Sequence, residues 1–127
     1  MKALVKLRKG SDGVAIGDVP EPVARPGEIK IKVYACGICG TDLHILKDEF
    51  ETEPPVVMGH EYAGTVVEVG EGVTDFAVGD KAVSMTTVYS CGECQYCFAG
   101  LYHLCETRKA LGCLINGGFA EYLTGPA

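Results

Sequence analysis

The chain has 127 residues, of which 47% are hydrophobic and 22% are charged, a composition typical of one globular domain. Its formal net charge of −6 argues against a nucleic-acid partner, because proteins that bind a phosphate backbone usually present a basic face. No apolar run reaches the roughly 20 residues that span a bilayer, and the N-terminus lacks the apolar stretch of a signal peptide. We therefore expect a cytoplasmic protein without nucleic-acid or membrane partners.

The predicted strands are short and are separated by glycine and proline. They cover Lys2–Leu7, Val14–Val19, Glu28–Tyr34, Glu61–Val69, Lys81–Met85 and Phe119–Thr124. In the third of these, apolar residues alternate with Lys30 and Lys32, which predicts a half-buried antiparallel strand with both lysines on its polar face. Many of the 17 glycines flank the strands, and this favours a curved sheet or barrel with sharp corners.

Three further segments complete the expected organisation. Pro20–Gly27 holds three of the six prolines and is predicted to be a loop. Thr41–Lys47 is predicted to be a short helix that begins after Gly40. Residues 91–105 show no hydrophobic period, so we expect a loop lobe organised around something other than an apolar core. The predicted fold class is thus mainly β, with short helices and one lobe.

Four of the seven cysteines lie in this lobe, with the spacing Cys-x2-Cys-x2-Cys-x7-Cys. They are Cys91, Cys94, Cys97 and Cys105. Four thiolates close a tetrahedron around zinc with no open position, which is the pattern of a structural site, and metal bonds would offset the entropy of ordering a coreless loop. Two alternatives remain open: buried free cysteines, and an iron–sulfur cluster, whose bacterial motifs also open with Cys-x2-Cys-x2-Cys.

A second ligand set is formed by Cys39, His60 and Glu61. One thiolate, one imidazole and one carboxylate would leave a fourth position for water or substrate, as in a catalytic zinc site. By itself this signal is weak. His60 could equally be a surface histidine beside a solvated acid, and Cys36 with Cys39 could form a redox dithiol. Neighbours on a strand face opposite sides, so His60 and Glu61 share a metal only if Gly59 kinks the chain.

Several ordered motifs resemble the zinc-containing alcohol dehydrogenase family, and are closest to its sorbitol (polyol) and threonine dehydrogenase branches. The motifs are Gly59-His60-Glu61-x2-Gly64-x5-Gly70-x2-Val73, the segment Gly37–His44, the four-cysteine lobe, the nearly matching turn Phe76–Val83 and the segment Gly117–Tyr122. The resemblance covers essentially all 127 residues. It implies a GroES-like, partly open β-barrel, which in this family is followed by a Rossmann domain that binds NAD(P).

The resemblance also implies roles for individual residues. Cys39 and His60 would hold a catalytic zinc, with Glu61 as a ligand or close neighbour. Asp42 would accept a hydrogen bond from the far nitrogen of His60. Thr41 would take the proton of the alcohol, and His44 would pass it to solvent. With the four-cysteine site, two zinc ions per chain are expected.

No Gly-x-Gly-x-x-Gly fingerprint follows a strand in this sequence. Residues 1–127 are therefore expected to be a GroES-like catalytic domain with residues 91–105 as its structural zinc lobe, without the Rossmann domain. Such a piece, excised or cut short, would bind zinc yet not turn over. The whole enzyme would oxidise a secondary alcohol or polyol with NAD(P) as a homodimer or homotetramer.

Two other readings stay open. One is a free-standing, zinc-stabilised GroES-like binding module without catalysis, in which the ligand set around Cys39 would have no purpose. The other is a zinc-free relative of the quinone-reductase type, which the seven ligand-type residues oppose.

Overall fold

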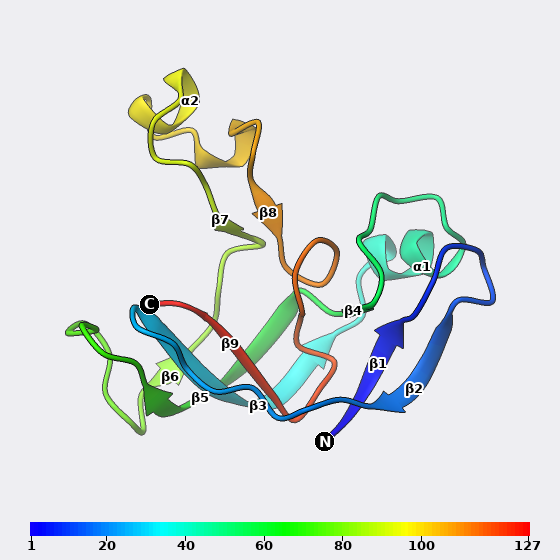
Figure 1. Cartoon of the computed structure of the whole chain (residues 1–127), viewed down its shortest axis with the longest axis horizontal. Coiled ribbons are helices and arrows are strands. Elements are labelled where there is room, and N and C mark those ends of the chain that lie inside the picture. Colours follow the sequence, from blue (N-terminus) through cyan, green and yellow to red (C-terminus); the bar gives the residue numbers. More distant parts are fainter.

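The computed structural model describes residues 1–127 and is built mainly from short antiparallel strands (Figure 1). In chain order the strands are β1 (Lys2–Lys6), β2 (Val14–Asp18), β3 (Glu28–Gly37), β4 (Val56–Val57), β5 (Glu61–Val69), β6 (Lys81–Ala82), β7 (Thr87–Tyr89), β8 (Lys109–Ala110) and β9 (Tyr122–Pro126). The helices are α1 (Gly40–Leu46), α2 (Gln95–Phe98) and the 3-10 turn η1 (Tyr102–Leu104). The prediction of a mainly β chain with short helices is confirmed.

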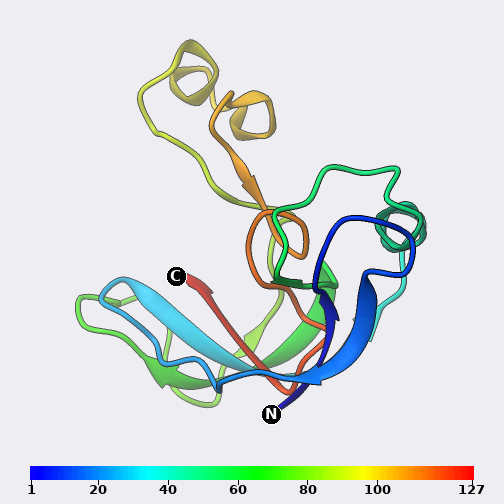
Figure 2. The ribbon, with the colours of Figure 1, turned by 45° about the vertical axis from the view of Figure 1, so that its right-hand side comes forward.

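The strands form three sheets, with the orders β2-β1-β4, β6-β5-β3-β9 and β7-β8. The four-stranded sheet carries the largest apolar cluster, which contains Ile29, Ile31, Tyr62, Val66, Ala82, Leu111 and Leu123. A second cluster joins β1 to β4, and a third packs α1 against the segment that follows β4. Figure 2 shows α1 beside the β1–β2 hairpin, at the opposite end of the molecule from the β5–β6 turn.

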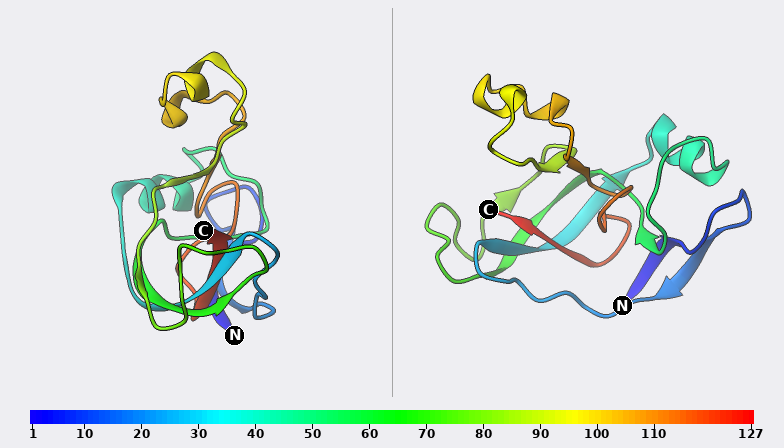
Figure 3. Two further views of the ribbon diagram at one scale, coloured as in Figure 1. Left: turned by 90° about the vertical axis from the view of Figure 1, so that its left-hand side faces the viewer. Right: turned by 45° about the horizontal axis from the view of Figure 1, so that its top comes forward.

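The four-cysteine lobe stands apart from the sheets. It is connected by β7 and β8, and it projects away from the barrel in every view (Figures 1 and 3). The lobe was expected to be a loop, and it contains two single-turn helices, α2 and η1. None of the helices combines the length and the apolar character that a membrane-spanning segment needs.

Several strand ends differ from the sequence prediction. The third strand continues to Gly37 because a bulge at Tyr34 lets it stay paired with β5 while its faces shift by one residue. Lys30 was expected on the polar face, yet its side chain is only 10% exposed. It lies between Glu21 and Glu68, with its Nζ 4.9 Å from the centre of the Tyr122 ring. A paired lysine thus occupies a buried position that alternation alone does not reveal.

Candidate metal centres

The four lobe cysteines point their sulfur atoms at one another. Their Sγ atoms all lie within 4.8 Å of one another. The measured separations are 3.6 Å for Cys94–Cys97, 3.6 Å for Cys91–Cys105 and 3.8 Å for Cys91–Cys97. A zinc tetrahedron with Zn–S bonds of about 2.3 Å has edges of about 3.8 Å. The donor set therefore fits one tetrahedral ion, and all seven cysteines of the chain are free thiols.

Backbone N–H groups of the lobe turn toward these sulfur atoms. The N–H of Cys91 lies 3.4 Å from Cys105 Sγ, and that of Cys94 lies 3.3 Å from Cys91 Sγ. The Cys91 N–H lowers the pKa of the Cys105 thiol to about 6, whereas burial raises the pKa of Cys97 to about 11. Amide donors favour the thiolate form, so the backbone stabilises negative charge at Cys105, whereas burial opposes it at Cys97.

Cys39, His60 and Glu61 also come together, although Cys39 lies far from the other two in the sequence. Cys39 precedes α1, His60 lies between β4 and β5, and Glu61 begins β5. One ligand atom of each lies within 4.8 Å of the others. This arrangement brings a thiol, an imidazole and a carboxylate to one place, as the sequence analysis required.

Glycines explain how His60 and Glu61 reach the same site. Gly59 has φ of +90°, a left-handed conformation that kinks the chain directly before His60. A Cβ atom at Gly37 would lie 2.8 Å from Glu61 Oε2, so the missing side chain leaves room for this carboxylate. The kink overrides the simple strand alternation that placed the two residues on opposite faces.

Two buried polar atoms beside this site have no hydrogen-bond partner. They are Asp42 Oδ1 and His60 Nδ1, which face each other at 3.7 Å. Asp42 is held in place by its other oxygen, which accepts a hydrogen bond from the Cys39 N–H at 2.8 Å. With Nδ1 directed at Asp42, the second ring nitrogen of His60 is the one available to a metal. The donor set and the orphaned pair therefore fit a zinc ion held by Cys39, His60 and Glu61.

The two residues expected to carry the proton lie on α1. Thr41 Oγ1 is 3.7 Å from Cys39 Sγ, next to the candidate site. His44 is exposed, and its Nδ1 contacts Glu49 Oε2 at 2.8 Å. No hydrogen bond joins Thr41 to His44 in this structure. The sequence analysis did not single out Glu49. The only feature that could have indicated it is the position of an acidic residue about one turn beyond His44.

Cys36 does not join the ligand group. Its Sγ packs where a Cβ of Gly59 or Gly118 would lie, at 2.9 and 3.2 Å. Burial raises the pKa of its thiol. A thiol with these surroundings is a packing group, and the redox-dithiol reading of Cys36 with Cys39 gains no support.

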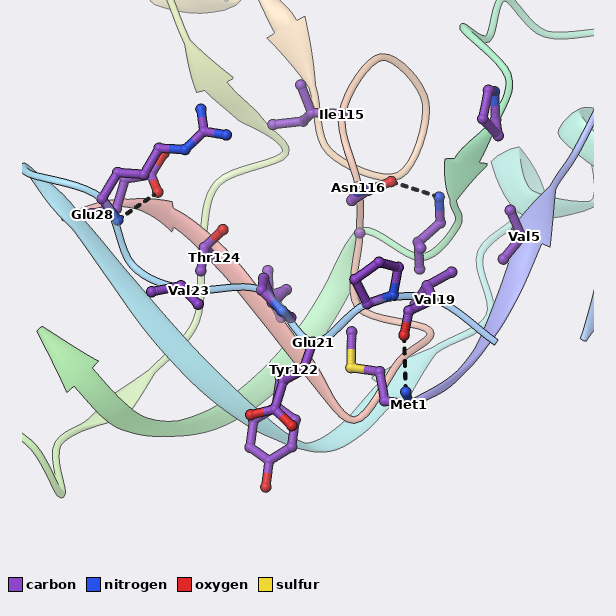
Figure 4. A pocket seen from close by; sticks show the side chains of 17 residues that line it. Met1, Val5, Val19, Glu21, Val23, Glu28, Ile115, Asn116, Tyr122 and Thr124 are labelled. Carbon is purple, nitrogen blue, oxygen red and sulfur yellow. Dashed lines mark hydrogen bonds between the residues drawn. The ribbon is translucent and has the colours of Figure 1, made fainter. Parts of the chain in front are cut away.

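One cavity of about 500 Å³ lies away from both metal centres, between the segment before β3, β9 and the loop around Asn116 (Figure 4). No candidate metal ligand lines it. Its polar groups are largely engaged within the chain: Asn116 Oδ1 accepts the Val57 N–H, and Glu28 accepts the Arg25 N–H. The cavity therefore adds nothing to the metal chemistry.

Comparison with known proteins agrees with this geometry. The alcohol dehydrogenase GroES-like domain family matches residues 25–127. A sorbitol dehydrogenase of Halalkalibacterium halodurans is 46% identical over 97% of this chain and 36% of its own length. An L-threonine 3-dehydrogenase of Cutibacterium acnes is 44% identical over 100% of this chain and 37% of its own length.

A solved structure from Sinorhizobium meliloti, described as a zinc-binding dehydrogenase bound to NADP, has a TM-score of 0.92 at 42% identity. The match covers 98% of the present chain and 36% of the Sinorhizobium meliloti chain. The chain thus spans little more than a third of the length of these relatives. The expected GroES-like fold and the likeness to sorbitol and threonine dehydrogenases are confirmed, and the chain belongs to the alcohol dehydrogenase GroES-like domain family.

Proposed function

We propose that this chain is the zinc-binding catalytic domain of a dehydrogenase that oxidises a secondary alcohol or polyol with NAD(P). The observation that carries the proposal is the meeting of Cys39, His60 and Glu61 ligand atoms within 4.8 Å. Three protein ligands of mixed type leave one position for a substrate oxygen or water, which distinguishes a catalytic zinc from a structural one. The names of the sorbitol and threonine relatives support a secondary alcohol as the reacting group.

Zinc bound at this site would polarise the alcohol oxygen and lower its pKa. Asp42 orients His60, because a proton on Nδ1 can be shared with the carboxylate oxygen that faces it at 3.7 Å. Thr41 accepts the proton of the alcohol at Oγ1, since a hydroxyl can donate and accept at the same time. Thr41 passes its own proton on as it accepts, and because no hydrogen bond joins Thr41 to His44, a bridging hydroxyl or water would have to carry it. His44, with its ring held by Glu49, then exchanges that proton with solvent.

The lobe has a different role in this proposal. Its four sulfur donors leave no open position, so a zinc ion held there would stabilise residues 91–105 and would not touch substrate. We therefore infer two zinc ions per chain, and we assign residues 1–127 to one catalytic domain. The nicotinamide cofactor would be bound by residues outside these 127, in an enzyme that forms a homodimer or homotetramer.

Metal analysis of the wild type and two variants tests the proposal. We expect about two zinc ions in the wild type, on the basis of one ion per site. Cys39→Ser should lose one ion and stay folded, because the lobe keeps its four ligands. Cys94→Ser should lose the other ion. Cys113→Ser is the matched control, since this buried thiol lies outside both ligand groups.

Two results would contradict the assignment. A wild type with one zinc ion that survives Cys39→Ser would remove the open site. Loss of an ion in Cys113→Ser would show that metal content follows general destabilisation and not the proposed ligands.

A further inference from the structure

Lys6 is the largest fully buried side chain of the protein, with 0% of its side chain exposed. Its Nζ donates to the carbonyl oxygens of Gly10 at 2.8 Å and Ile45 at 3.0 Å, and lies 3.0 Å from Asp48 Oδ1. These contacts use all three N–H donors of the ammonium group. A lysine is almost never buried to this extent unless it is paired, so the position demands an explanation.

The contacts of Lys6 join the two segments that carry the proposed ligands. Its side chain holds Ile45 O, in the last turn of α1, the helix that directly follows Cys39. Its backbone pairs with Val56 of β4, four residues before His60. The same strand β1 accepts the Met58 N–H at Leu4 O, at 3.0 Å. One residue therefore connects the Cys39 segment to the His60 segment.

The geometry of α1 lets a contact at one end affect the other. The helix has seven residues, which corresponds to a length of about 10 Å at 1.5 Å per residue. Ile45 is fully buried and packs on Met58 and Cys113. A displacement of the last turn would move Cys39 and Asp42 relative to His60, because the helix is too short to absorb the change by bending.

Stability alone is a poor explanation for such a group. The ammonium group of Lys6 is removed from water, whereas the Asp48 side chain keeps 29% of its surface exposed. The desolvation cost of such a buried charge offsets much of what its contacts return, so a well-packed apolar side chain often serves equally well. The contacts of Lys6 instead fix an orientation, because each carbonyl or carboxylate oxygen holds one N–H group of the ammonium in a defined direction. The contacts of Lys6 suit a residue that determines where α1 sits.

We propose that Lys6 is a positioning residue for the open metal site. Its ammonium group anchors the last turn of α1 against β1 in the one placement that directs Cys39 and Asp42 at His60. This proposal rests on the proposed function, because it requires that Cys39, His60 and Glu61 bind a metal.

Cobalt titration tests it, since Co²⁺ replaces zinc and its ligand-field spectrum reports coordination geometry at each site. The difference between spectra with and without Cys39→Ser isolates the open site. In Lys6→Met we expect the Co²⁺ affinity of the open site to fall by about 10- to 100-fold, the usual effect of losing a residue that orients ligands. Its ligand-field bands should also change, while the four-thiolate bands stay as in the wild type. Lys2→Met is the matched control, because Lys2 lies on the same strand and is exposed.

The outcomes separate this proposal from the one on which it rests. A wild type without any open-site cobalt spectrum overturns both. A wild-type spectrum that is unchanged in folded Lys6→Met, in affinity and in shape, overturns only the role of Lys6. If Lys6→Met does not fold, Asp48→Asn decides: it removes the counter-charge and leaves the lysine, and it should weaken open-site cobalt binding in the same direction. Unchanged cobalt binding in Asp48→Asn overturns the proposal.

Discussion

Gly59 illustrates how a single residue without a side chain can control a site. Its φ of +90° strains any residue that carries a Cβ, and a Cβ there would lie 2.8 Å from the ring of Phe119 and 2.9 Å from Cys36 Sγ. Gly59→Ala should therefore cost more than the 1–3 kcal/mol or so of backbone strain alone. Because the kink also directs His60, the open site should lose its metal while the lobe keeps its own. Chemical denaturation and metal analysis measure the two effects.

Gly72→Ala is the control for this variant. Gly72 has a similar φ of +83°, but nothing lies within 4 Å of an added Cβ. It should show the backbone strain without the steric overlap, and it should retain both metals. Equal losses of stability in the two alanine variants would show that the contacts with Phe119 and Cys36 contribute nothing.

Asp48 provides a pH-dependent test at the same scale. The Gly10 N–H, and then Lys6, lower the pKa of its carboxyl below the ordinary value of 3.8. A carboxyl whose pKa is lower in the folded state stabilises the fold above its unfolded pKa, and this contribution disappears as the pH falls through the folded pKa. Asp48→Asn should thus melt at a lower temperature than the wild type near pH 6.

As the pH falls through the lowered pKa of the Asp48 carboxyl, the melting temperatures of Asp48→Asn and the wild type should converge. Both proteins should be measured after metal has been removed with a chelator, so that metal release does not contribute to the difference between them. A difference that does not shrink as the pH is lowered below 3.8 would show that ionisation of Asp48 is not its cause.

At the scale of elements, patterning predicted β1, β2, β3, β5, β6 and β9 at least in part, and it missed three short strands. The alternation of β3 and the apolar residues of β5 gave their positions correctly. Strands β4, β7 and β8 have two or three residues each, too few to show any period. The bulge at Tyr34 was also not predictable, because it depends on which residue of β5 lies opposite.

The lobe has little apolar burial of its own. It contributes only Cys97 and Cys105 to the buried residues of the chain, and Phe98 is 79% exposed. With so little apolar burial, loss of the metal should unfold residues 91–105 and leave the barrel folded. Limited proteolysis of Cys94→Ser should therefore give early cleavage in this segment, followed by a resistant core.

Cys113→Ser again serves as the control for the lobe. It places a hydroxyl in the cluster of Ile45 and Met58, so it should lower the stability of the barrel and leave the lobe resistant. Early cleavage of residues 91–105 in both variants would mean that the lobe depends on the barrel and not on its own metal ligands.

For the molecule as a whole, the two candidate sites were predictable to different extents. Cysteine spacing alone predicted the lobe, because its four ligands lie within fifteen residues. The open site was predicted only through the ordered motifs, since Cys39 and His60 are twenty-one residues apart. The contacts that join their segments, through Lys6 and the glycines around Gly59, are long-range. No local sequence pattern predicts such contacts.

The chain alone should bind metal without catalysing hydride transfer. Dehydrogenation requires the nicotinamide ring to be held against the substrate carbon, and these 127 residues contain no dinucleotide-binding fingerprint. Zinc-loaded chain mixed with NAD or NADP and either sorbitol or threonine should therefore produce no reduced nucleotide, and calorimetry should detect no tight nucleotide binding. The Cys39→Ser chain should behave in the same way. Nucleotide reduction by the wild type that disappears in Cys39→Ser would show that these residues suffice to bind the cofactor, and would contradict its assignment to residues outside them.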